Sequence, residues 1–417
     1  MGQPDHVHRP KRANKNPAVL PSLSRYQRST GFAQLTDSAL RWRNWPPPSE
    51  QTVRDFADTC VRPLQAAMIE TGRPPRDLWI EAGRRGLLGL AVPLAYGGGE
   101  AKDWKFSAIL MEELAAVSAA IPSFLSIHFD VVAPYLVELT TEEQRERWLP
   151  RFCTGDLVTT IAMTEPSGGS DLARIRTNAV RDGTDWILSG SKTFITNGGS
   201  ADLLVVAART NRASGSKGIT LFGVEAGMPG FSRGRNLDKV GQREADTAEV
   251  FFDEVRVPQQ NVIGQVDRGF QHMMRMLPQE RLGAAVTSLA HARPILQLTL
   301  AYAKERQAFG TPIGSMQHNK FHLAEMATKL DVAQSFVDAC IDVHCAGALS
   351  PVAAAKAKWW CADVQNQIID RCVQLHGGYG YMNEYRVARA WTDARVSKIW
   401  AGSNEIMKEI IGRDLGL

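Results

Sequence analysis

The sequence predicts an α+β protein in which a helical segment, a β segment and a second helical segment follow one another. Near both ends of the chain, apolar residues recur three and four positions apart, which is typical of amphipathic helices. Between about residues 157 and 263 the period falls toward two, and β-branched and aromatic runs alternate with glycine turns. Because helices and strands come in separate blocks, a doubly wound parallel sheet is not favoured.

The length supports several packed units, since 417 residues with 44% hydrophobic content exceed one ordinary core. The expected parts are a basic flexible arm (1–36), an N-terminal α-helical domain (37–155), a middle antiparallel β domain (156–265) and a C-terminal helical domain like a four-helix bundle (266–417).

The basic residues gather in the first 43 positions, together with Pro4, Pro10, Pro17 and Pro21. This composition is typical of a flexible arm, which is either a solvated tail or a targeting peptide. The stretch has no apolar core of secretory type, and Asp5 and the prolines disfavour an amphipathic transit helix. A cytoplasmic location is therefore expected.

Composition excludes several classes of function. The net charge is only +4, so no strong field of one sign points to nucleic acid as a partner. The six cysteines are dispersed and His376 has no companions at metal spacing, which indicates reduced thiols and no metal site. No uninterrupted apolar run approaches the roughly 18 residues of a membrane span. A soluble protein with no membrane span is expected.

The first helical segment is indicated by Phe106, Ile109, Leu110 and Leu114, which recur at helical spacing. A later helix is expected to begin at Thr141, where a hydroxyl and two glutamates precede an apolar run.

The β segment contains four clear strands and one hairpin turn. Gly183, between Asp182 and Thr184, is placed for the positive φ that such a turn requires. The strands are expected at 186–188, 203–208, 219–224 and 250–252.

The second helical segment is expected to hold three long helices, at residues 281–306, 316–346 and 350–375. Breaks fall at Gly310, Pro312, Gly314 and Gly347. Long antiparallel helices with short connections form a bundle. Neither a GxGxxG nor a GxxxxGK[ST] run is present, so a Rossmann or P-loop site is not supported.

Five motifs in this order resemble the acyl-CoA dehydrogenase family, over the whole chain beyond the arm. They are GLLGLAVP with YGGG (86–93 and 96–99), AMTEPSGGSD (162–171), KTFITNG (192–198), ERQAFG followed by Gln317 (305–310) and QLHGGYG (374–380). The resemblance implies the acyl-CoA dehydrogenase fold and FAD as the cofactor.

The residues of the second and third motifs suit a flavin. Its polar ring edge needs backbone amides and hydroxyls, which Met163, Thr164 and Thr196 provide, and its face needs an aromatic wall, which Phe194 provides. Gly169 and Ser170 allow backbone N–H groups to close on a pyrophosphate. Taken alone, the glycine run is also explained by a strand followed by a tight turn.

The resemblance also implies a shared cofactor site. Residues that reach the adenosine half of an FAD held by the neighbouring subunit are Arg306, Phe309, Gln317, Gln374 and Gly378. Ser403 and Glu405 are expected against the flavin. Cofactor binding then requires at least a dimer. A homodimer or homotetramer is expected, with a hetero-oligomer as the alternative.

The implied reaction is α,β-dehydrogenation of a fatty or branched acyl-CoA thioester to the trans-2-enoyl-CoA. Many members carry the proton-accepting glutamate where this chain has Ala401, which keeps the backbone N–H that stabilises the enolate but supplies no carboxylate. Long-chain and isovaleryl members resemble this chain at Glu280 and use that glutamate as base. By position alone, Glu280 also reads as a first-turn helix residue facing water.

The same resemblance implies substrate contacts at Ser170, Arg281 and Gly402, and electron-transfer flavoprotein as the electron acceptor. Glu405 is a weaker candidate base. A structural subunit that has lost catalysis is the main alternative, and an oxidase or flavin monooxygenase is a smaller one.

Overall fold

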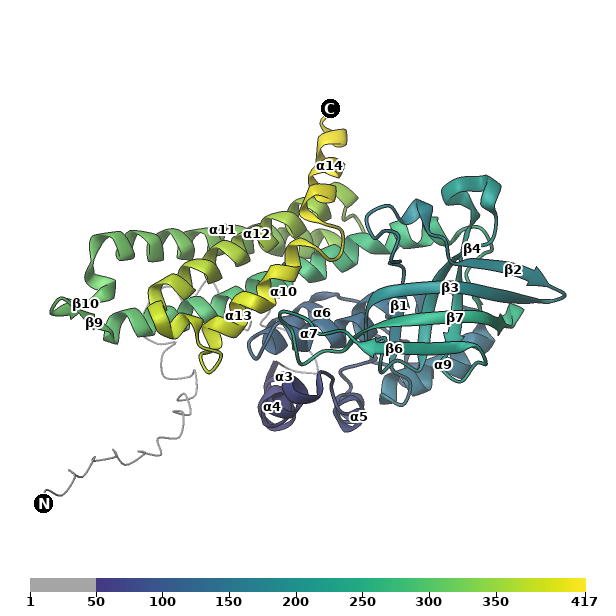
Figure 1. The fold of residues 1–417 in the computed structure, drawn as a ribbon, viewed down its shortest axis with the longest axis horizontal. Coiled ribbons are helices and arrows are strands. Elements are labelled where there is room, and N and C mark those ends of the chain that lie inside the picture. The colour runs from purple at the N-terminus through teal and green to yellow at the C-terminus, as the bar shows by residue number, and fades with distance from the viewer. Residues whose placement is uncertain (1–49) are drawn as a thin grey trace, which may run out of the picture. The chain divides into compact units, whose positions relative to one another are not determined.

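The structure, a computed structural model, describes residues 50–417. The expected arm (1–36) and the first part of the expected helical domain lie outside the described residues. Within them, helices, strands and helices follow one another, so the predicted α+β order is confirmed (Figure 1).

The N-terminal part is helical. Thr141 caps α9 by accepting a hydrogen bond from the Gln144 backbone N–H (3.3 Å), and the Gln144 side chain accepts from the Thr141 N–H (2.8 Å), which confirms the predicted helix start. The helices are α3 (Glu50–Phe56), α4 (Arg62–Thr71), α5 (Arg76–Arg84), α6 (Lys105–Ala115), α7 (Ala120–Ser126), α8 (Ala133–Glu138) and α9 (Glu142–Thr154).

A π-helical turn, Ile127–Val132, joins α7 and α8 into one helical run. Among the described residues, this run, Ala120–Glu138, is the one segment long and apolar enough to cross a membrane, with a mean hydropathy of 1.4. However, 78% of it is buried inside the protein and it contains His128 and Asp130, which is the pattern of a core helix.

The middle part is a sheet of eight strands. The turn at Gly183 (φ +62°) links β2 to β3, with Val180 opposite Ile187, as predicted. The strands are β1 (Thr159–Ala162), β2 (Asn178–Asp182), β3 (Asp185–Thr196), β4 (Leu203–Arg209), β5 (Ile219–Glu225), β6 (Phe231–Asn236), β7 (Thr247–Val257) and β8 (Val262–Ile263).

The strand order is β6-β7-β3-β2-β4-β5-β8, with β1 paired to β4. Most pairs are antiparallel, as predicted, but β1 and β2 both run parallel to β4, with Thr159 opposite Leu203 and Asn178 opposite Arg209. The hairpin β2–β3 intervenes in the chain between β1 and β4 and serves as the crossover that parallel pairing requires. Both faces of β4 are buried, which explains its unbroken apolar sequence.

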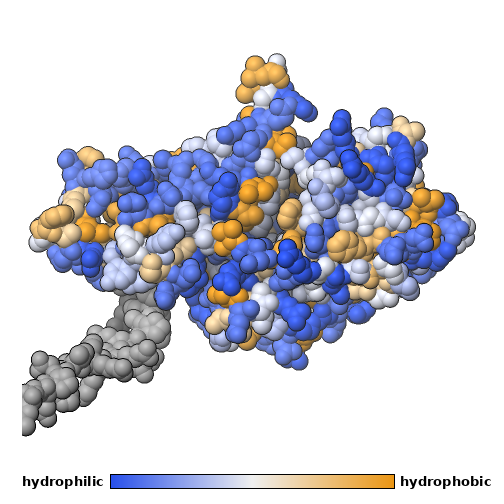
Figure 2. Space-filling view, in the orientation of Figure 1, coloured by the Kyte–Doolittle hydropathy of each residue, from blue (hydrophilic) through white to orange (hydrophobic). Residues whose placement is uncertain are grey.

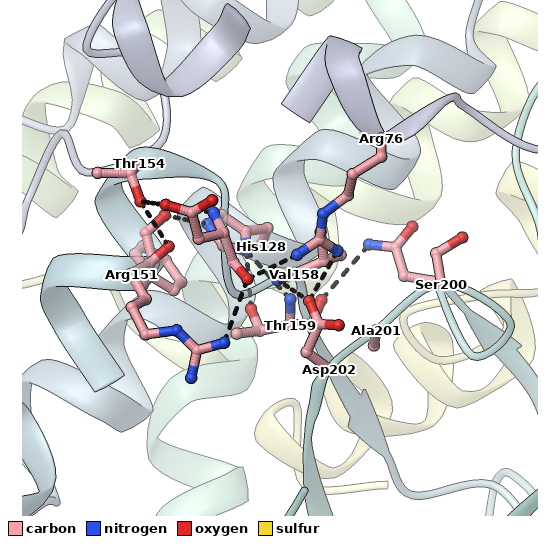
Figure 3. Close-up of polar contacts among 12 residues, drawn as sticks. Arg76, His128, Arg151, Thr154, Val158, Thr159, Ser200, Ala201 and Asp202 are labelled. Carbon is pink, nitrogen blue, oxygen red and sulfur yellow. Dashed lines mark hydrogen bonds and ion pairs between the residues drawn. The ribbon is translucent and has the colours of Figure 1, made fainter. Parts of the chain in front are cut away.

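Polar contacts, some exposed and some buried, attach the helical part to the sheet (Figure 3). Arg76 of α5 forms an ion pair with Asp202 at 2.7 Å, and Asp202 also accepts a hydrogen bond from the Val158 N–H at 2.8 Å. The Nδ1 of His128 accepts from the backbone N–H of Thr159 at 3.2 Å, so its Nε2–H donates to the Phe152 carbonyl at 3.1 Å. Burial lowers the pKa of His128 to about 3, and the ring is neutral.

A buried ion pair lies behind the loop that follows β1. The Lys192 ammonium of β3 donates to Glu165 at 2.9 Å and to the Met163 carbonyl at 3.0 Å. Glu165 also accepts from the backbone N–H groups of Arg176 (2.6 Å) and Thr177 (2.8 Å). Burial acts to raise the pKa of Glu165, but Lys192 and these donors outweigh it and hold the pKa below its ordinary value.

The C-terminal part contains three long helices that pack side by side, with a small hairpin at the end of the bundle away from the sheet (Figure 1). Ser350 caps α12 by accepting from the Ala353 N–H at 3.0 Å. The elements are α10 (Gly269–Glu305), β9 (Gln307–Ala308), β10 (Thr311–Pro312), α11 (Gln317–Cys345), α12 (Pro351–His376), α13 (Arg386–Ala394) and α14 (Asn404–Asp414).

The expected start of the first long helix at residue 281 was wrong, because α10 begins at Gly269 and includes Pro278. A proline inside a helix removes one hydrogen bond and strains the turn before it. Buried Met273 and Leu277 on the same helix offset that cost. Glu280 therefore lies about three turns inside α10, not in its first turn.

We predict that acid destabilises the fold through its buried neutral histidines. His128 and His291 both have a pKa lowered by burial to about 3, whereas an unfolded histidine takes up its proton near pH 6.5. Stability is therefore complete above that pH and falls toward pH 3, by about 1.4 kcal/mol per pH unit for each histidine. Urea unfolding between pH 7 and pH 5 measures this slope. A His128→Gln variant with the wild-type slope would contradict the assignment.

We predict a large loss of stability on breaking the ion pair behind the β1 loop. Lys192→Met leaves Glu165 buried and unpaired, and we expect a loss of about 3–5 kcal/mol in unfolding free energy. The control is Arg256→Met, which removes an exposed ion pair with Asp182 and should cost less than about 1 kcal/mol. Equal losses in the two variants would show that the buried pair has no special weight.

Candidate active site

Glu280 lies on α10, and part of its side chain remains exposed to solvent. The surrounding protein nevertheless removes most of the water around its carboxylate. Burial raises the pKa of Glu280 to about 6, while Arg281 and Lys358 act in the opposite direction. No hydrogen bond or ion pair within residues 50–417 engages its carboxylate. A deep carboxylate with remaining accessible surface and no partner is suited to accept a proton.

The loop before α14 has a strained backbone. Ala401 has a φ of +51° and Gly402 a φ of +86°, and a positive φ is uncommon for alanine. The backbone N–H of Ala401 donates to no acceptor among the described residues. Ser403 caps α14 by accepting a hydrogen bond from the Ile406 N–H at 3.4 Å. Strain and a free N–H in one short loop are features of a binding site.

Lys358 of α12 holds this loop in place. Its ammonium donates to the Gly402 carbonyl at 2.7 Å and to Asn404 Oδ1 at 3.2 Å, and the side chain is 1% exposed. Burial lowers the pKa of Lys358 to about 8, Arg281 lowers it further, and Glu405 and Glu280 oppose them.

The structure brings Glu280 and Arg281 together with this loop. A Cβ built on Gly402 would lie 3.9 Å from the Arg281 Nη2, so the Arg281 side chain reaches the loop. Glu280 is close enough to Lys358, which holds the loop, for their charges to interact. Arg281 and Trp400 each have a buried side-chain nitrogen without a hydrogen-bond partner among the described residues. Unpaired buried donors indicate that an absent polar group completes the site.

The expected flavin residues of the sheet also meet. The Thr193 N–H donates to the Thr164 carbonyl at 3.0 Å, which joins the loop after β1 to the second half of β3. Phe194 has a φ of +58° and is 69% exposed, so a strained backbone presents an aromatic ring at the surface, two residues before Thr196. Exposed Gly169 lies against the Thr164 methyl group, 3.2 Å from a Cβ built on the glycine.

Ser170 follows in the same loop and is exposed. Met163 and Thr164 precede Glu165, so the buried ion pair of Glu165 with Lys192 anchors the whole stretch. Lys192 has a structural role here, consistent with the absence of a phosphate-binding lysine motif.

The remaining expected cofactor residues lie on the helical bundle. Arg306, Gln374 and Gly378 line a hollow of about 450 Å³, and a Cβ built on Gly378 would meet nothing within 4 Å. Phe309, at the tip of the β9–β10 hairpin, is 99% exposed with a φ of +53°. Gln317 is exposed at the start of α11.

Hydrophobic atoms are visible on the surface at the hairpin end of the bundle and at the end of α14 (Figure 2). The predicted residues form three groups, one at the sheet, one at Glu280, Arg281 and the loop before α14, and one at the hairpin end of the bundle.

Glu405 is exposed and lies in the first turn of α14. Its own backbone N–H and the Ser403 hydroxyl hold the pKa of Glu405 below its ordinary value. A carboxylate stabilised in this way is a weaker proton acceptor than Glu280.

Two groups at the site were not expected from the sequence, the ammonium of Lys358 and the carboxylate of Asp130. Lys358 lies in an alanine-rich run directly before Trp359, and a lysine on the buried face of a helix is the signal that could have revealed it. Nothing in the sequence distinguishes Asp130.

The residues present fit a flavin dinucleotide. The sheet group offers backbone edges, hydroxyls and an exposed aromatic ring, which suit the isoalloxazine. The buried, unpaired nitrogens of Arg281 and Trp400 are available to a polar ligand. The hollow beside Gly378 has room for part of an adenosine group.

Comparison with known proteins agrees with this fit. The models of the N-terminal, middle and C-terminal domains of acyl-CoA dehydrogenase match residues 49–156, 160–255 and 267–416. The mitochondrial long-chain specific acyl-CoA dehydrogenase of Sus scrofa is 42% identical over 408 residues, which cover 95% of this chain and 94% of that protein.

Two solved structures are similar. The crystal structure of acyl-CoA dehydrogenase from Geobacillus kaustophilus is 43% identical, with a TM-score of 0.87, and the match covers 88% of this chain and 97% of that one. A glutaryl-CoA dehydrogenase from Mycobacterium smegmatis in complex with FADH2 is 30% identical, with a TM-score of 0.82 and coverage of 88% and 93%. The chain therefore belongs to the acyl-CoA dehydrogenase family and is an FAD-dependent oxidoreductase that dehydrogenates acyl-CoA thioesters.

Proposed function

We propose that Glu280 is the base that removes the α-proton of the acyl-CoA. The observation that carries this assignment is the approach of the Glu280–Arg281 turn to the loop of Ala401 and Gly402. The carboxylate is unpaired, and burial raises its pKa to about 6, so it is ionised at neutral pH yet retains a useful affinity for a proton. FAD, when bound, supplies the acceptor for the β-hydrogen.

The backbone at Ala401 completes the proposed chemistry. Its unpaired N–H would donate to the thioester carbonyl and stabilise the negative charge that develops when Glu280 takes the proton. Lys358 supports this role by fixing the carbonyl of the next residue, Gly402. Retention of both Glu280 and this N–H argues against the alternative of an inactive structural subunit.

The cofactor contacts are part of the same proposal. Flavin contacts are assigned to the sheet group and to the start of α14, at Met163, Thr164, Gly169, Ser170, Phe194, Thr196, Ser403 and Glu405. Substrate contacts are assigned to Ser170, Arg281 and Gly402.

The proposed assembly follows from the hairpin end of the bundle. We infer that Arg306, Phe309, Gln317, Gln374 and Gly378 bind the adenosine of an FAD whose flavin lies on a second chain. The exposure of Phe309 supports this, because an aromatic ring that the described residues leave almost wholly exposed is expected to be covered by another chain. A homodimer or homotetramer follows, with a hetero-oligomer as the alternative.

Three further assignments extend the proposal. The substrate is a long or branched acyl-CoA, the electron acceptor is an electron-transfer flavoprotein, and the protein is cytoplasmic. The first two rest on the resemblance to long-chain and isovaleryl members, and the third rests on the composition of the N-terminal arm.

We predict that Glu280→Gln prevents reduction of the flavin. Anaerobic titration with a panel of straight and branched acyl-CoAs should bleach the wild-type flavin, and the variant should be slower by about 10³-fold, the scale of a lost general base. In the wild type the rate should rise with pH through about 6, because the base acts only when ionised.

Glu244→Gln is the matched control, since Glu244 is a buried glutamate that accepts a hydrogen bond from Gln65 at 2.9 Å, outside the site. This control should bleach at the wild-type rate. A Glu280→Gln protein that bleaches as fast as the control would show that another group is the base.

We predict that two inactive variants restore activity when they assemble together. Glu280→Gln lacks the base, and Gly378→Trp fills the hollow proposed for the adenosine. If each flavin uses two chains, one site of a mixed dimer combines an intact Glu280 with an intact Gly378. Co-expressed and purified through a different tag on each chain, the mixture should regain roughly a quarter to a half of wild-type activity. No gain over the separate variants would indicate that one chain holds the whole cofactor.

A further inference from the structure

Asp130 lies in the π-helical turn between α7 and α8 and is 2% exposed. One carboxylate oxygen, Oδ1, accepts hydrogen bonds from Trp104 Nε1 at 2.6 Å and from Gln279 Nε2 at 2.9 Å. Gln279 also donates to the Asp130 backbone carbonyl at 2.9 Å. Two bonds therefore tie the π-helical turn to the residue directly before Glu280. Such turns are often found at functional sites.

The second carboxylate oxygen of Asp130 has no hydrogen-bond partner among the described residues and is buried. It faces Gly283, one turn of α10 beyond Gln279, where a built Cβ would lie 3.2 Å from it and 3.2 Å from the Met111 methyl group. A glycine at this position lets the carboxylate approach α10 closely. Asp130 thus contacts both ends of the helical turn, residues 279–283, that carries Glu280.

Few charged groups lie near Asp130 and Glu280. Burial raises the pKa of Asp130 to about 7, Trp104 and Gln279 oppose the rise, and Glu280 adds to it. No basic side chain pairs with Asp130 in the part of the chain that the structure describes.

The titratable groups close enough to interact electrostatically with Glu280 are Arg281 on its own helix, Lys358 of α12, Asp130 of the π-helical turn and Tyr135 of α8. Tyr135 is buried and its hydroxyl has no partner among residues 50–417. Two carboxyl groups in such a setting do not both ionise easily, because each charge opposes the other.

We propose that Asp130 is a positioning residue for the proton acceptor Glu280 and holds the turn of α10 from Gln279 to Gly283 against the π-helical turn. The inference rests on the proposed role of Glu280 as base. It assigns to Asp130 no contact with substrate or flavin.

Two consequences follow from this arrangement. A fixed base reacts faster, because misplacement by about 1 Å can cost on the order of 10²-fold in rate. In addition, Asp130 keeps its proton while Glu280 ionises near pH 6 and loses it only near pH 7. The rate of flavin reduction should therefore depend on two titrations, which belong to the pair of Glu280 and Asp130.

Two variants of Asp130 separate these consequences. Asp130→Asn keeps the acceptor for Trp104 and Gln279 but removes the titrating proton. Asp130→Leu removes both hydrogen bonds and leaves two buried donors unpaired. Asp393→Asn is the control, because Asp393 is also buried with a pKa raised to about 7, yet it bonds to the Gln242 N–H outside the site.

The measurement is the rate of flavin reduction after rapid anaerobic mixing with acyl-CoA, between about pH 5.5 and pH 8.5, on holoenzymes of equal FAD content. We expect Asp130→Leu to lower the rate by about 10 to 100-fold, with acyl-CoA affinity changed less than about threefold. We expect Asp130→Asn to keep the rate at pH 6.5 within about threefold and to lose the second titration. Asp393→Asn should keep both titrations.

The proposal is overturned if Asp130→Leu reduces flavin at the wild-type rate, or if Asp130→Asn keeps both titrations. If Asp130→Leu does not fold, the pH profile of Asp130→Asn decides alone. Glu280→Gln, measured in parallel, separates the two claims. Flavin reduction that survives in Glu280→Gln refutes the base itself, whereas its loss alongside wild-type behaviour in both Asp130 variants refutes only the role of Asp130.

Discussion

Burial of α10 along most of its length is the constraint on which the rest of the structure depends. This helix packs against α12 and α11 within the bundle, against α6 of the N-terminal part, and against β5 of the sheet. A helix with partners on several sides cannot rotate or slide without losing apolar contacts with all of these partners. Its side chains are therefore fixed relative to the sheet and to the loop before α14, and the position of Glu280 follows from that packing.

Buried titratable side chains then fix the segments of the site relative to α10. Lys192, Lys358 and Asp130 are all almost fully buried, and each bonds to a loop or turn that carries expected functional residues. Burying a charged group costs desolvation free energy, which a partner offsets only in part. Stability alone therefore does not explain why these groups are buried. Lys192 and Lys358 hold irregular backbone, in which strand or helix hydrogen bonds cannot set the geometry, whereas Asp130 ties the π-helical turn to α10. In this protein, buried polar groups position the segments that the regular elements leave free.

Much of the fold could be predicted from local sequence. The cap at Thr141 and the turn at Gly183 depend on one or two residues and their immediate neighbours, and both were predicted. The start of α10 was missed because Pro278 is a local signal for a break, and tertiary burial of Met273 and Leu277 overrode it. The parallel pairing of β1 was missed because pairing direction is set by a strand distant in the chain.

Some residues of the candidate site could likewise be predicted from local sequence, and others could not. The motifs indicated which stretches matter, and the structure brings Glu280, Arg281 and Gly402 into one region. Lys358 and Asp130 could not be foreseen, since their importance lies in contacts between elements far apart in sequence.

Pro278 has one more consequence, which concerns local opening of the helix. Because proline has no N–H, the carbonyl one turn earlier, at Met274, lacks its helical donor. The hydrogen-bond ladder of α10 is thus interrupted two residues before Glu280. A long helix opens most cheaply where its ladder is already broken, so the first turns of α10 form a unit that can exchange its amide protons separately from the rest. The candidate base lies two residues beyond this break, on the side of it that continues into the bundle.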